Sequence, residues 1–213
     1  MSTLKATNLS HASAASPNIV LDSAGKVTFG GAVAGAGMDL ITPTSVAGSG
    51  VTVSGGAVSF SASSTVSVNG CFTATYANYL IVSTFVTTST DEETFLRLRA
   101  SGTDAITNYD HQYILASSTT VSAARATGAT SYRIMGGTAN TNHNAFSLQT
   151  LGPNVSAATE FISNGYTTGS SGRLEDTVGR HTTASAYDGF TVIPQNGGST
   201  ITGTLRVYGL RNS

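Results

Sequence analysis

The sequence has very few charged residues. Lys, Arg, Asp and Glu together make up 10% of its 213 residues, with a net charge of −1, against about 25% in an average soluble protein. Neither a basic stripe for nucleic acid nor an acidic tail is present. So little charge gives weak protection against edge-to-edge pairing of strands. The composition therefore favours an oligomer that buries its edges, with few ionisable groups from which to build an active site.

Cysteine occurs once, at Cys71, which excludes an intrachain disulfide. Between Gly70 and Phe72 we interpret it as a small buried core residue, because the sequence assigns no partner base for a catalytic thiol.

Long apolar runs are also missing. No segment approaches the roughly 18 apolar residues of a membrane span, so no membrane insertion is predicted. Residues 1–5 lack the apolar core of a signal peptide, which predicts synthesis in a cytoplasm without standard export. Apolar residues still make up 39% of the chain, and this favours an ordered protein over a disordered one.

Short β-strand patterns fill the rest of the chain. Residues 51–53, 57–60 and 66–68 alternate at period two, and the longer apolar run 79–86 predicts a central strand. Leu96 and Leu98 alternate with Arg97 and Arg99, one face in and one out. No helical stripe of apolar residues appears. About eight short strands with turns between them predict an all-β, jelly-roll-like antiparallel β-sandwich. The turns are expected at Asn69-Gly70, Asn164-Gly165, Asp188-Gly189 and Asn196-Gly197.

The N-terminal part of the sequence, residues 1–37, is predicted to be separate from the β-sandwich. Two apolar runs within residues 18–29, joined by a Gly-containing turn, predict an extended β-hairpin, and residues 30–37 form a Gly/Ala-rich linker. We therefore predict an attachment or trimerisation segment at 1–37 and a β-sandwich head at 38–213.

Candidate chemical sites are sparse. The four histidines have no metal-ligand spacing, and the sequence contains no nucleophile elbow or phosphate-binding loop. Two carboxylate clusters could supply an acid/base pair, but each is interpreted as a solvated turn, the first paired with Arg97 and Arg99 across a hairpin. We predict no catalytic, metal or cofactor site. The histidines are His11, His111, His143 and His181; the clusters are Asp91, Glu92 and Glu93, and Glu175 with Asp176.

Tyrosines remain as possible recognition residues, because each combines an apolar ring with a polar tip. The alternative for any one of them is packing in the core or at its rim. The six candidates near expected loops and strand ends are Tyr109, Tyr113, Tyr132, Tyr166, Tyr187 and Tyr208.

Four stretches carry a family resemblance: MSTLKATNL (1–9), LDSAGKVTF (21–29), FLRLRASGTDAITNYDHQY (95–113), and the closing strands with DGF (188–190), ITG (201–203) and VYG (207–209). In them the chain resembles bacteriophage virion proteins of the marine phage type, specifically the jelly-roll modules at the ends of tail fibres and on some capsid fibres. The resemblance implies a homotrimer that docks on the particle by its N-terminus. It also implies head loops that contact a host polysaccharide or outer-membrane receptor, although no receptor-binding residue transfers by motif.

Three functions follow as hypotheses. The first is a non-enzymatic virion appendage, such as a tail fibre or receptor-binding protein, for which multivalent attachment would strengthen weak single contacts. The second is a capsid decoration or head-fibre protein that binds the shell. The third is a glycan-degrading tailspike, against which the short chain, the lack of β-helix periodicity and the few carboxylates argue. In each case the expected location is the virion.

Overall fold

The computed structural model divides the chain into two compact units, Met1–Gly37 and Met38–Asn212, and each is described by itself. The residues it describes are 8–9, 19–21, 27–29, 37–89, 92–138, 143–167 and 172–211.

The N-terminal unit contains a small antiparallel sheet of β1 (Asn8–Leu9), β2 (Ile19–Leu21) and β3 (Val27–Phe29), in that order. Ile19 pairs with Phe29 and Leu21 with Val27, so the two strands of the predicted hairpin are confirmed. The turn at 22–26 and most of the linker, 30–36, lie outside the described residues. Strand β1 was not predicted.

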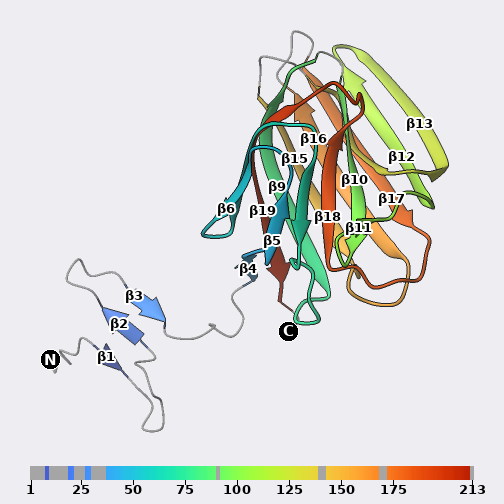
Figure 1. Ribbon diagram of the computed structural model, residues 1–213. Coiled ribbons are helices and arrows are strands. Elements are labelled where there is room, and N and C mark those ends of the chain that lie inside the picture. Colours follow the sequence, from blue (N-terminus) through green and yellow to red (C-terminus); the bar gives the residue numbers. More distant parts are fainter. Residues whose placement is uncertain are drawn as a thin grey trace, which may run out of the picture. The chain divides into compact units, whose positions relative to one another are not determined.

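Every regular element described in the second unit is a strand (Figure 1). No described segment is a helix long and apolar enough to cross a membrane. The strands are β4 (Met38–Ile41), β5 (Ser45–Ala47), β6 (Val51–Ser54), β7 (Ala57–Ser63), β8 (Val66–Asn69), β9 (Asn78–Thr87), β10 (Glu92–Ala100), β11 (Thr103–Asp104), β12 (Tyr109–Ser117), β13 (Thr120–Ala129), β14 (Tyr132–Thr138), β15 (Asn144–Leu151), β16 (Thr159–Thr167), β17 (Arg173–His181), β18 (Gly189–Pro194) and β19 (Ile201–Leu210).

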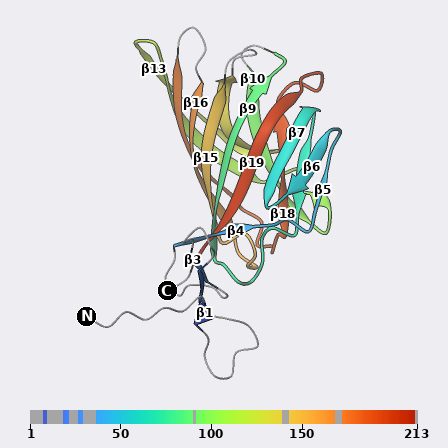
Figure 2. The ribbon, with the colours of Figure 1, turned by 90° about the vertical axis from the view of Figure 1, so that its left-hand side faces the viewer.

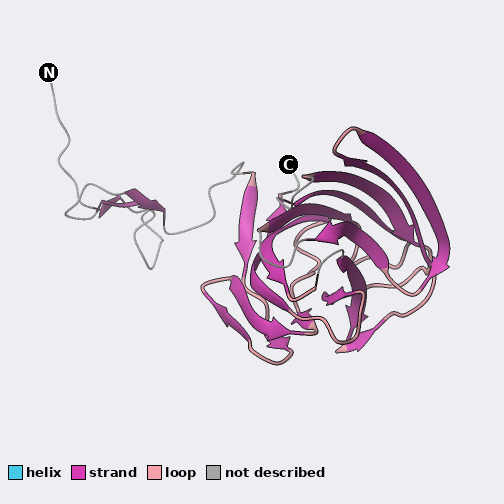
Figure 3. Cartoon of the chain, turned by 90° about the horizontal axis from the view of Figure 1, so that it is seen from above, coloured by secondary structure: helices cyan, strands magenta, loops and turns pink. Residues whose placement is uncertain are grey.

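These strands form two antiparallel sheets packed as a sandwich. The larger sheet runs β13-β12-β17-β16-β15-β9-β19-β7-β6, with β4 also paired to β19, and Figure 2 shows much of it. The smaller sheet runs β11-β10-β18-β8-β5, with β14 also paired to β10. Seen from above, the strands of the head follow curved paths (Figure 3). The chain passes repeatedly from one sheet to the other.

The predicted all-β, jelly-roll-like antiparallel sandwich is thus confirmed, and the apolar run 79–86 is indeed the interior strand β9. The expected number of about eight strands was too low, because several strands lack an apolar alternation. The turn predicted at Asn164-Gly165 is also wrong, since both residues lie inside β16. A Cβ on Gly165 would come within 2.6 Å of Met135 Cβ, so the glycine provides room for close packing between sheets.

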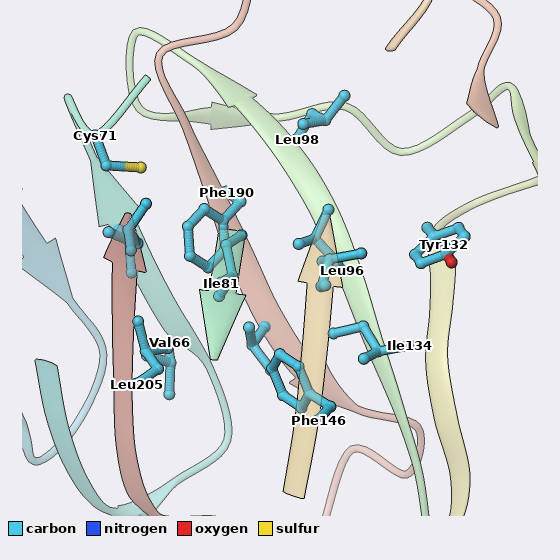
Figure 4. Close-up of a cluster of buried hydrophobic side chains, with 14 of the residues drawn as sticks. Val66, Cys71, Ile81, Leu96, Leu98, Tyr132, Ile134, Phe146, Phe190 and Leu205 are labelled. Carbon is cyan, nitrogen blue, oxygen red and sulfur yellow. The ribbon is translucent and has the colours of Figure 1, made fainter. Parts of the chain in front are cut away.

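The core lies between the sheets and is made of aliphatic and aromatic side chains from both (Figure 4). Leu96 and Leu98 of β10 are fully buried, as their alternation predicted, and belong to the same buried cluster as Ile81 and Leu205 from the larger sheet. Cys71 is fully buried in the same cluster, so its interpretation as a core residue is confirmed. Burial of a large apolar side chain of this kind stabilises the fold by about 1.5–3 kcal/mol.

The strands β16 and β17 reverse the usual polarity of a sandwich. Their inward positions include Ser163, Glu175 and Thr177, all buried, while Ile162 and Val178 face outward and are exposed. Ile162 and Val178 are direct cross-strand partners. In this part of the large sheet, therefore, polar side chains occupy much of the interior, and large apolar side chains lie among polar ones on the outer face.

Candidate functional site

A groove lies between the outward face of the small sheet and the β12–β13 hairpin. On β10, Phe95 and Arg97 alternate with the buried Leu96 and Leu98 and so face away from the core. Strand β13 is an edge strand, and the hairpin's inward residues form the opposite wall. The groove has a volume of about 390 Å³. Its lining includes Phe95, Arg97, His111, Tyr113, Arg133 and Ile193.

One end of the groove is built on a buried ion triad. Arg133 of β14 is 7% exposed and binds Glu175 of β17, which is 1% exposed, through Nε–Oε1 at 2.6 Å and Nη2–Oε2 at 3.1 Å. The other terminal nitrogen, Nη1, pairs with Glu93 of β10. The parallel geometry of the Glu175 contact fixes the plane of the guanidinium. Burial alone would lower the pKa of Arg133, but Glu175 and Glu93 together raise it above its ordinary value.

Local backbone features make room for this triad. The Gly136 N–H donates to Glu175 Oε2 at 2.9 Å, and the Thr177 hydroxyl donates to Oε1 at 3.3 Å. A Cβ on Gly136 would overlap the Arg133 guanidinium. The cross-strand partner of Glu175 on β16 is Gly165, which has no side chain either. Gly136 therefore leaves room for the guanidinium and the carboxylate, whereas a Cβ on Gly165 would meet Met135.

Tyr113 covers the guanidinium from the groove side. The Arg133 Cζ lies 3.9 Å from the centre of the Tyr113 ring, in a cation–π contact. The triad and this ring together form a rigid wall rather than a mobile loop.

His111 is the other unusual residue of the groove. It is 7% exposed, its ring meets Tyr132 edge-on at 6.0 Å, and its Nδ1 has no hydrogen-bond partner among the described residues. Burial, followed by the positive charge of Arg133, lowers the pKa of His111 despite Glu175 and Asp110. The imidazole is therefore neutral at pH 7, with an unused polar atom beside the groove.

The structure corrects the interpretation of the carboxylate clusters as solvated turns. Glu92 is fully buried and accepts hydrogen bonds from Asn196 N and Nδ2, at 2.7 and 3.0 Å, and from Ser199 Oγ at 2.6 Å. Glu175 is buried on Arg133, whereas Asp176 is exposed and accepts a hydrogen bond from Asn164 Nδ2. Buried carboxylates need such donors, and the donors come from segments that are distant in sequence. Asp91 lies outside the described residues.

The predicted pairing of the first cluster with Arg97 and Arg99 is also wrong. Both arginines lie on the same strand as Glu92 and Glu93, where a cross-strand contact is impossible. Arg99 pairs with Asp104 and also donates to Thr191 Oγ1. Arg97 donates its Nε to the Thr130 carbonyl at 3.2 Å.

His181 lies on β17, two positions along from the residue that pairs with His111 of β12. His181 is buried, with Nε2 3.0 Å from the Thr107 carbonyl and Nδ1 3.1 Å from the Tyr187 hydroxyl. His143 lies directly before β15 and His11 is outside the described residues. Within the described part of the chain no group of three His, Cys, Asp or Glu residues could hold a metal ion.

The tyrosines divide between the two roles considered for them. Tyr109, Tyr132 and Tyr187 are buried in the core, and burial raises the pKa of each hydroxyl. Tyr113 lines the groove, Tyr166 is exposed on the outer face of β16, and Tyr208 is half-buried. Only Tyr113 therefore belongs to the site. The signal that sequence reasoning lacked was Arg133, an isolated arginine that brings Glu93 and Glu175 together.

This geometry suits binding. Both carboxylates that the fold brings together are engaged by the same guanidinium, and one of them is out of reach of solvent. The absence of catalysis remains a prediction. Compared with known proteins, the chain matches no protein-family model and no curated protein sequence.

Proposed function

We propose that the protein is a non-enzymatic bacteriophage virion appendage of the tail-fibre or receptor-binding kind, which binds host-surface glycan through its β-sandwich head. The observation that carries this proposal is the groove of about 390 Å³, with Phe95 and Tyr113 among its lining residues and a fixed charged wall at Arg133. Concave sites with aromatic rings and a few oriented polar groups are typical of small-ligand recognition. The sequence resemblance supports the location on a virion.

We further propose a homotrimer attached to other virion proteins by residues 1–37. The apolar outer face of β12, β16 and β17 supports association between copies, because its exposed side chains are neighbours across the strands. They form cross-strand pairs, Ile162 with Val178 and Tyr166 with Leu174, on either side of the polar pair Asn164 and Asp176, and groups of exposed apolar side chains mark interaction sites. These side chains are Ile114, Ile162, Tyr166, Leu174 and Val178.

Adhesion is tested with the purified full-length chain. It should stain cells of a susceptible host and reduce infection when added before the phage. If no strain of the phage's host range binds it, the adhesion proposal is wrong. Incubation with host polysaccharide should leave the size distribution of the polymer unchanged, and a loss of polymer mass would instead support a glycan-degrading activity.

The alternative function is a capsid decoration or head-fibre protein. The same apolar face favours it, because a hollow of about 440 Å³ lies there, lined in part by Gln112, Ile162 and Val178, and could receive a surface of the shell. Electron microscopy of virions labelled with an antibody against the head separates the two. Signal on the capsid and not on the tail would favour decoration.

A further inference from the structure

We infer that the groove is selective for an acidic sugar, with the Arg97 guanidinium as its carboxylate-binding group. This inference rests on the proposed glycan-binding function and names the class of glycan.

The unpaired guanidinium of Arg97 points to an anion. The other arginine of the groove, Arg133, is engaged by two carboxylates, those of Glu93 and Glu175. Arg97 is half-buried in the groove, and among the described residues no carboxylate pairs with it. The two arginines and two glutamates balance one another in number, but Arg97 is the one cation of the groove lining that no described carboxylate pairs with, four residues along β10 from Glu93.

Arg97 is also held in a suitable position. Its Nε donates to the Thr130 carbonyl at 3.2 Å, which anchors the base of the guanidinium and leaves the two Nη groups for a ligand. A planar guanidinium binds a carboxylate through two parallel hydrogen bonds, and less conformational freedom is lost when the side chain is already anchored.

The remaining lining accepts a sugar ring. Phe95 and Ile193 lie side by side as cross-strand partners on the outward face of the small sheet, and Tyr113 and Ala126 are part of the opposite lining. Such apolar surfaces pack against the C–H faces of a sugar while its hydroxyls and carboxylate bind at the polar positions.

The test is isothermal titration calorimetry of the full-length chain with oligogalacturonate, a uronic acid oligomer, and with the neutral oligomer of galactose. We expect the acidic oligomer to bind and the neutral one to bind at least tenfold more weakly. Arg97→Gln should weaken binding of the acidic oligomer about 10- to 150-fold, the equivalent of one charge-assisted hydrogen-bonded contact. The matched control is Arg206→Gln, an exposed arginine on the outer face of β19, which should leave binding unchanged.

The unfolding midpoint of Arg97→Gln, measured beside that of the unsubstituted chain, separates binding from folding. Loss of binding with a retained midpoint supports the inference.

The outcomes distinguish the inference from the function on which it rests. Equal binding of the acidic and neutral oligomers, or full affinity in Arg97→Gln, would overturn the acidic-sugar inference while leaving glycan adhesion intact. Chains that stain host cells but bind neither oligomer overturn the inference as well. Chains that neither stain cells nor bind any oligomer contradict the proposed function itself.

Discussion

Removal of Arg133 should be among the most destabilising single changes in the head. Arg133→Met deletes the only cation that contacts the buried Glu175 among the described residues. The carboxylate would then keep only the Gly136 N–H and the Thr177 hydroxyl as donors. Glu93, which is partly exposed, can turn to solvent, so the penalty falls on Glu175. Breaking a buried ion pair on one side costs about 3–5 kcal/mol, which in a chain of this length lowers the unfolding midpoint by about 6–20 °C.

Urea denaturation of the full chain, followed by circular dichroism, measures this change in the free energy of unfolding. The control is Arg180→Met, whose pair with Asp110 spans 3.6 Å and is largely exposed, and which should cost less than about 1 kcal/mol. The double variant Arg133→Met/Glu175→Met should be more stable than Arg133→Met alone, because the unpaired charge is gone. A cost below about 1 kcal/mol for Arg133→Met would refute a buried, charged triad.

Four further predictions follow from the same structure. Cys71 should not react with a disulfide reagent at pH 8 until the protein unfolds, because burial raises the pKa of its thiol and excludes the reagent; reaction in the native state would contradict this. Gly203→Ala should cost about 1–3 kcal/mol or more, since its Cβ would come within 2.7 Å of the neighbouring strand's backbone, whereas Gly197→Ala, with open space around it, should be nearly neutral in the same denaturation assay. Burial lowers the pKa of His181, so the unfolded chain binds a proton first and stability should fall as the pH drops below about 6.5, with a shallower fall in His181→Gln. Leu174→Asp, on the exposed outer face, should reduce the oligomer mass measured by light scattering, and an unchanged mass would remove that face from the interface between copies.

The sequence was sufficient to predict the fold class because apolar alternation marks the core strands directly. Leu96 and Leu98 are buried, and Arg97 faces out, as period two requires. Prediction failed where the alternation is reversed. In β17 the outward residues Leu174 and Val178 are apolar and the inward Glu175 is charged, so a sequence pattern cannot indicate which face is buried.

The candidate site could not be predicted from the sequence, for a related reason. Glu93, Arg133 and Glu175 come from three strands that become neighbours only when the β12–β13 hairpin and β17 pack beside β14. Local spacing marked the two glutamates as members of separate clusters and gave no reason to choose Arg133. Such a contact depends on the register between strands that are far apart in the chain. The pattern of apolar residues specifies this register only where one face of the sheet is consistently buried.

The reversed polarity of the large sheet also bears on why the triad is there. An apolar cluster of similar volume could be as stable as a buried ion triad, so stability alone does not account for it. The triad does hold the Arg133 guanidinium over the Tyr113 ring, with Cζ 3.9 Å from the ring centre, and it pairs Glu93, the carboxylate of the groove lining, with that guanidinium. A carboxylate without a cation at that wall would repel an acidic ligand more strongly than Glu93 does beside Arg133. Under the proposed function, the polar interior of this sheet supports a groove for an anion, and the exposed apolar side chains of its outer face belong to a surface between copies.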